Sequence, residues 1–241
     1  MGANYDMILS AGVSQPQVID SVKAFLQQQG YRALRVVGYD SFRQQRPKAI
    51  DMVCFVGPPS KRGWLPVVAN CSTLRISLHD WFTLNPLARH LSFTARAAIY
   101  LWCYDSGFAA GYTLFLQGER QAVQTVFTRT VTERETELIP GVLPVPEDYQ
   151  GATSLAHVLN DASFGYGEFT SRYFDLEDAT AAFVASLGIK EHLCDFDLLA
   201  RGMDAFAVVD GKYQPISLSS EWVVIIYERL QGHEPHQGQQ R

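Results

Sequence analysis

The chain has 241 residues, of which 47% are hydrophobic and 19% charged, and its formal net charge is −5. This composition is typical of a folded globular protein and excludes disorder over the main body of the chain, because there is enough apolar material to form a core. The longest apolar run, residues 97–104, is too short for a membrane span, and the N-terminus lacks the basic and apolar regions of a secretory signal, so we expect a soluble, cytoplasmic protein.

Charge is distributed unevenly along the chain. Residues 1–129 contain 13 Lys and Arg against 7 Asp and Glu, a balance of +6, whereas residues 130–241 contain 7 against 18, a balance of −11. One interpretation is that the two parts face each other and partly cancel. The other is that the C-terminal part presents an acidic surface to a basic partner, because complementary charge steers association.

The N-terminal third predicts strands and helices in alternation. Residues 5–10 are expected to form a strand, and a helix follows, with Ser14 as its cap, Pro16 in its first turn and Gly30 at its end. Strands are predicted at 35–39, 50–56 and 64–69. The polar segment 41–48 is expected to be a loop, and segment 57–64, GPPSKRGW, a solvated hairpin connection rather than a phosphate-binding loop, because its prolines remove amide donors.

The middle of the chain predicts a helix and a meander. Asn85 and Pro86 are typical of a helix start, and we expect that helix to end near Arg96 with Leu87, Leu91 and Thr94 on one side. Residues 97–131 then predict three antiparallel strands. Cys103 lies in a run that is apolar on both faces, which is typical of a central strand and an inert thiol, and Asp105-Ser106-Gly107 has the composition of a turn.

The C-terminal half begins with an irregular segment, 133–175, that contains several prolines and glycines. Within it, residues 164–174, FGYGEFTSRYF, interleave aromatic residues with glycines, so this loop lines a pocket or interface, or else covers the edge of a core. A helix is predicted at 177–187, closed by Gly188, with a second helical segment at 190–199. Strands at 206–209 and 213–218 flank Asp210-Gly211, a type I′ hairpin signal, and a last strand is predicted at 222–227.

These elements predict an α+β fold: a mainly antiparallel sheet with helices packed on one face, plus a C-terminal helix and three-strand meander unit. The expected organisation is an N-terminal unit at 1–132, an irregular connector at 133–175, a C-terminal unit at 176–231 and a disordered tail at 232–241. The two units either share one core or form separate domains.

Residue types that carry chemistry are present but scattered. The cysteines at 54, 71, 103 and 194 form no C-x-x-C pair, so we expect free thiols and neither a disulfide nor a metal site. His79, Asp80 and Asp105 are the candidates for catalysis, although no catalytic motif accompanies them. No cofactor is expected, and nucleic-acid binding is disfavoured because basic residues form no stripe.

The order of a "GW…VV" strand, a helix with "LARHLS", a strand pair ending "YTLFLQGE" and a late "AAFVASLGI" helix resembles that of uncharacterised bacterial proteins found near toxin genes. The resemblance implies a binding role. The resemblance and the acidic C-terminal half together favour a non-enzymatic binding protein, for instance an immunity-type inhibitor of a basic toxin or of another basic protein. The alternative is a small-molecule hydrolase or transferase with a pocket near loop 164–174. The candidate binding residues are Tyr166, Glu168, Tyr173, Asp175, Glu177, Asp178, Glu191, Asp195 and Asp197.

Overall fold

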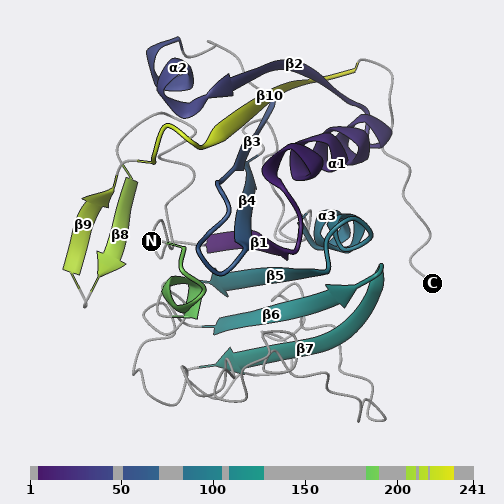
Figure 1. Ribbon diagram of the computed structural model, residues 1–241, viewed down its shortest axis with the longest axis vertical. Coiled ribbons are helices and arrows are strands. Elements are labelled where there is room, and N and C mark those ends of the chain that lie inside the picture. Colours follow the sequence, from purple (N-terminus) through teal and green to yellow (C-terminus); the bar gives the residue numbers. More distant parts are fainter. Residues whose placement is uncertain are drawn as a thin grey trace.

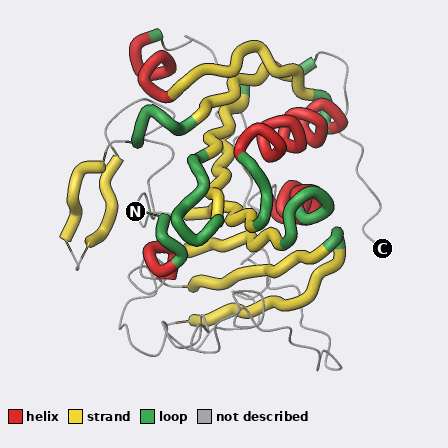
Figure 2. Tube along the Cα trace, in the orientation of Figure 1, coloured by secondary structure: helices red, strands yellow, loops and turns green. Residues whose placement is uncertain are grey.

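The computed structural model describes residues 5–45, 51–70, 84–104, 109–127, 183–189, 205–209, 212–216 and 218–230. This part of the chain combines an antiparallel sheet of eight strands with a few helices and a separate two-stranded hairpin (Figures 1 and 2). The mixed α and β fold with an antiparallel sheet is therefore confirmed. The predicted boundaries between the two units lie outside the described residues.

The eight-stranded sheet has the order β2-β10-β3-β4-β1-β5-β6-β7, and each neighbouring pair is antiparallel. Its strands are β1 (Tyr5–Ala11), β2 (Tyr31–Gly38), β3 (Met52–Val56), β4 (Trp64–Asn70), β5 (Ala97–Tyr104), β6 (Ala109–Leu116), β7 (Glu119–Phe127) and β10 (Val223–Arg229). The separate hairpin consists of β8 (Ala205–Val209) and β9 (Lys212–Ile216), and the helices are α1 (Gln15–Gln28), α2 (Tyr39–Gln44) and α3 (Leu84–Leu91).

The last strand corrects the predicted C-terminal meander. The expected strand at 222–227 exists as β10, but it lies between β2 and β3 in the large sheet and does not extend the β8–β9 hairpin (Figure 1). Val224, Ile225, Ile226 and Tyr227 are all buried, so the strand is apolar on both faces. A central position in a sheet covered on both sides buries all four side chains, whereas a third strand on a small hairpin would expose half of them.

Helix α1 forms where its sequence signals predicted. The backbone N–H and the hydroxyl of Ser14 both donate to Oε1 of Gln17, at 3.0 and 2.7 Å, which fixes the start of the helix. Val18, Val22 and Leu26, spaced by one helical turn, are buried, and Gly30 follows the helix at a φ of 81°, a conformation that favours glycine.

Helix α2 corrects the first part of the loop predicted at 41–48, of which residues 46–48 lie outside the described residues. Tyr39, predicted to end a strand, instead begins this helix, and Tyr39 and Phe42 lie on one side of it, each 1% exposed. The Phe42 ring meets the ring of Phe55 edge-on at 5.8 Å, and the Tyr39 N–H donates to the Trp222 carbonyl. Tertiary burial of two aromatic side chains therefore outweighs the polar local sequence.

Helix α3 ends five residues earlier than predicted. It begins at Leu84, so Asn85 and Pro86 both lie in its first turn, and it ends at Leu91 rather than near Arg96. Tight turns follow, in which the Phe93 and Thr94 amides donate to carbonyls three residues back. Thr94 is consequently exposed, while Leu87 and Leu91 are buried as predicted.

Two clusters of buried side chains lie on the two faces of the sheet. One contains the buried residues of α1 and α3, such as Val22 and Leu87, with Ile8 of β1 and Tyr100 of β5. The other contains Tyr39 and Phe42 of α2 and the segment 183–189, with alternate residues of the same strands. Both faces of the sheet are thus covered, with described helices on each, which corrects the prediction that the helices pack on one face.

The predicted meander and hairpin are present. Strands β5, β6 and β7 pair consecutively, and Gln117 and Gly118, with φ angles of 51° and 80°, form the tight turn between β6 and β7. Strands β8 and β9 pair with Val209 opposite Lys212. The Asp210-Gly211 turn itself lies outside the described residues.

Candidate functional site

The residues predicted to bind or to catalyse do not fall in the described part of the chain. This applies to the nine candidate binding residues, to loop 164–174, and to His79, Asp80 and Asp105. Both function hypotheses therefore stay predictions.

One segment of the acidic half is fixed against the sheet. Residues 183–186 are helical, and the side chains of Phe183, Val184, Leu187 and Ile189 are buried in the cluster that also contains Phe55 and Trp222. Gly188 follows at a φ of 78°. The predicted burial of Phe183 and Leu187 and the closing role of Gly188 are thus confirmed, whereas the first part of the predicted helix, 177–182, lies outside the described residues.

The β3–β4 connection holds this segment in place. The Ser60 hydroxyl donates to the Leu187 carbonyl at 2.7 Å. The Trp64 backbone N–H in turn donates to the Ser60 hydroxyl oxygen at 3.2 Å. Lys61 and Arg62 are exposed, as expected for a solvated hairpin connection. The loop that resembled a phosphate-binding loop therefore has a structural role, because the Ser60 hydroxyl joins the first and second halves of the chain.

A buried thiol and a buried phenol lie on adjacent strands of the α1–α3 face. Burial raises the pKa of the Cys54 thiol to about 12, and burial, followed by the neighbouring Cys54, raises the pKa of the Tyr227 hydroxyl. Both side chains are at most 1% exposed. A thiol that stays protonated and has no access to solvent is not a nucleophile, so Cys54 is a core residue.

Cys103, the thiol singled out by the sequence, lies near the end of β5, opposite Tyr5 of β1 and Ala110 of β6. Its strand is internal to the sheet, and residues 97–102 are all buried. This confirms the predicted central strand that is apolar on both faces. The inertness of the Cys103 thiol stays a prediction.

An exposed sheet edge is the surface that sequence reasoning missed. We call the exposed stretch Arg32–Val36 of β2 the β2 edge; all five of its residues are exposed. Leu34 and Val36 are 47% and 45% exposed, which makes them two of the three large hydrophobic side chains that are exposed in the described part of the chain. The signal in the sequence was YRALRVVG, where arginines fall on both faces of the strand, a pattern typical of an edge.

The third exposed hydrophobic side chain, Phe93, lies over the β6–β7 turn. It is 67% exposed, and a Cβ atom on Gly118 would lie 2.0 Å from its ring. The Gly118 amide donates to the Ser92 hydroxyl at 2.8 Å, and the Gly118 carbonyl accepts from Nε of Arg89 at 2.7 Å. This arrangement fixes the turn against the end of α3.

Comparison of the chain with protein-family models, curated proteins and solved structures gave no match. Among the described residues, His, Cys, Asp and Glu side chains form no group that could hold a metal ion. None of the described helices combines the length and the apolar character that crossing a bilayer requires.

Proposed function

We propose that this protein is a non-enzymatic binding protein that associates with a basic protein through acidic side chains of residues 130–241, in the manner of an immunity-type inhibitor. The observation that carries the proposal is the charge distribution, −11 in this half against +6 in residues 1–129. An acidic surface attracts a basic partner during diffusional encounter and repels other acidic proteins, which gives both speed and selectivity.

The anchored segment 183–189 supports the proposal. It lies in the middle of the acidic candidate residues in the sequence: Asp178 is five residues before Phe183, and Glu191 is two residues after Ile189. Its four buried apolar side chains and the Ser60 hydrogen bond attach this part of the acidic half to the rigid sheet. A binding surface that is anchored in this way loses less conformational entropy when a partner binds.

The test is capture of the partner from the native host with the full-length protein, followed by binding kinetics. The variant carries Asp178→Lys, Glu191→Lys and Asp195→Lys. The matched control carries Asp20→Lys, Asp40→Lys and Glu119→Lys, the same change in net charge at three exposed residues of the first half.

We expect the first variant to associate at least about tenfold more slowly, with a smaller change in dissociation, because long-range attraction acts mainly on the association rate. The control should lose much less. Equal losses in the two variants would show that only net charge matters and would contradict a binding site in the acidic half. Turnover of a small molecule by the isolated protein would contradict the non-enzymatic assignment.

A further inference from the structure

We infer that the β2 edge binds an extended, acidic segment of a partner protein by strand addition. This edge carries arginines and includes none of the candidate acidic binding residues, so the inference goes beyond the proposed function and its test can fail or succeed independently.

The backbone of β2 is available on one side. In the described part of the chain β2 pairs with β10 alone, and it forms one end of the sheet (Figure 1). In an antiparallel strand, alternate residues direct their N–H and C=O groups away from the paired neighbour. An added strand satisfies these groups with main-chain hydrogen bonds, and the exposed side chains select its sequence.

The side chains of the edge are apolar and basic. Leu34 and Val36 supply exposed apolar area. Arg35 donates to the amide oxygen of Gln45 at 3.1 Å, and no described carboxylate lies within ion-pair distance of it, so its charge is not neutralised within the described residues. An acidic side chain on an added strand would provide that neutralisation, because an arginine guanidinium binds a carboxylate through charge-assisted hydrogen bonds.

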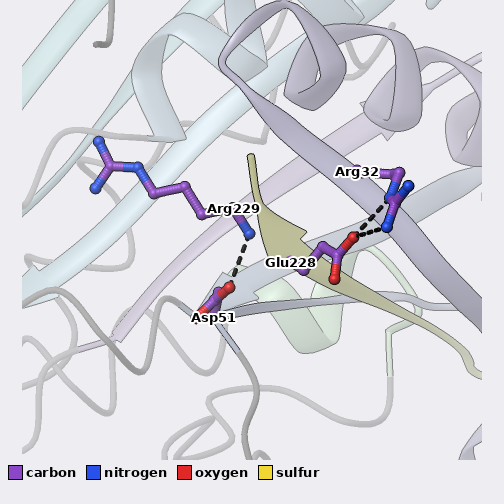
Figure 3. A network of polar contacts seen from close by, with 4 residues as sticks. All are labelled: Arg32, Asp51, Glu228 and Arg229. Atoms are coloured by element: carbon purple, nitrogen blue, oxygen red, sulfur yellow. Dashed lines mark hydrogen bonds and ion pairs between the residues drawn. The ribbon is translucent and has the colours of Figure 1, made fainter. Parts of the chain in front are cut away.

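The neighbouring strand β10 contributes one charge of each sign, Glu228 and Arg229. Arg32 forms an ion pair with Glu228 of β10, and the Arg229 backbone N–H donates to the carboxylate of Asp51 at 2.8 Å (Figure 3). The Arg229 guanidinium points away from that carboxylate in Figure 3. Within the described residues Glu228 therefore neutralises Arg32, so Arg35 is the arginine of the β2 edge whose charge is left for a partner.

These charges also decide between two occupants. Pairing of β2 with β2 of a second copy would place Arg32 and Arg35 of both copies along one seam, and facing like charges destabilise a strand pair. Arginines on an edge, and a register shift such as the one between Ile226 and Tyr227, both discourage non-specific pairing. An acidic segment instead meets complementary charge along the β2 edge.

The test uses two capped nine-residue peptides, one alternating Val and Glu and one alternating Val and Lys, with the full-length protein. Binding is measured by fluorescence anisotropy, and the site is mapped by amide hydrogen exchange. We expect the acidic peptide to slow exchange in residues 32–38 and to bind about tenfold more tightly than the basic peptide, because a few exposed charge contacts together contribute about that factor.

Arg35→Glu should remove this preference for the acidic peptide. Arg120→Glu, the same charge change on β7 at the opposite end of the sheet, should leave it intact. Slower exchange outside β2, equal binding of the two peptides, or no binding would overturn the inference. A concentration-dependent dimer that protects residues 32–38 without peptide would assign the edge to a second copy and would also overturn it.

Discussion

The turn between β6 and β7 offers a quantitative test of how α3 fixes the meander. Gly118 has a φ of 80°, and a Cβ atom at this position would lie 2.0 Å from Cζ and 2.3 Å from Cε1 of Phe93. Gly118→Ala therefore introduces two separate costs. The first is the positive φ, which an L-residue resists, and the second is displacement of the Phe93 ring.

The two costs have different magnitudes and a different dependence on Phe93. The positive φ destabilises the folded state by about 1–2 kcal/mol for a residue with a Cβ. Displacing the ring adds about 1–2 kcal/mol, because Phe93 is 67% exposed and can move outward, but it gives up its packing on the turn. We expect Gly118→Ala to lower the free energy of unfolding by about 2–4 kcal/mol.

Gly63→Ala is the matched control, because Gly63 has a φ of 76° and no atom of the described residues lies within 4 Å of the place that a Cβ atom would take there. It should cost only the positive-φ part, about 1–2 kcal/mol. The assay is urea unfolding followed by circular dichroism. In a Phe93→Ala background, Gly118→Ala should cost no more than Gly63→Ala. Equal costs of the two glycine substitutions in the parent, or an unchanged cost without Phe93, would refute the steric argument.

Three further predictions concern the core, the anchored segment and the C-terminal hairpin. Because burial raises the pKa of folded Cys54 to about 12, the unfolded thiol loses its proton first as the pH rises above about 8.5. Between about pH 8.5 and 10, below the range in which tyrosines titrate, this thiol should lower the free energy of unfolding by up to about 1.4 kcal/mol per pH unit. Cys54→Ala should flatten that slope in urea titrations at several pH values. Ser60→Ala should destabilise by about 1–2 kcal/mol and speed amide exchange in residues 183–189, because the Leu187 carbonyl loses its donor; unchanged exchange there would exclude the anchoring role. Gly211→Val should lower the melting temperature, because a β-branched residue resists the positive φ of a type I′ turn, and a parental melting temperature would show that the turn has another type.

Local signals predicted the elements whose stabilising contacts are close in sequence. Helix α1 carries its cap, its apolar spacing and its closing glycine within residues 14–30, and the β5–β7 meander follows from short turns between apolar strands. Helix α2 was missed because its stability depends on contacts of Tyr39 and Phe42 with Phe55 and Trp222, which no local pattern records.

The position of β10 could have been inferred more fully than it was. Its sequence, VVIIYER, is apolar at consecutive positions, a pattern that favours a central strand over the edge of a small meander. What the sequence does not encode locally is the identity of the partners, since β10 pairs with β2 and β3, which precede it by more than 160 residues.

The two candidate surfaces differ in the same way, because one can be recognised from the sequence and the other depends on long-range strand pairing. The acidic half is a property of composition and was visible at once, whereas the β2 edge depends on which strand ends the sheet. The predicted strand, 35–39, did not include Arg32 or Leu34, and the exposure of Leu34 and Val36 follows from the position of β2 at the end of the sheet.

The most direct test of the proposed function is the association rate constant of the captured partner at two ionic strengths. At low salt the screening length is about 30 Å, and at physiological salt it is about 8 Å, so attraction between an acidic half and a basic partner extends much further at low salt. We predict that association is markedly faster at low salt for the parent protein and that this difference largely disappears when Asp178, Glu191 and Asp195 are replaced by lysine. An association rate that is independent of salt, or a salt dependence that the lysine variant retains in full, would contradict binding through the acidic half.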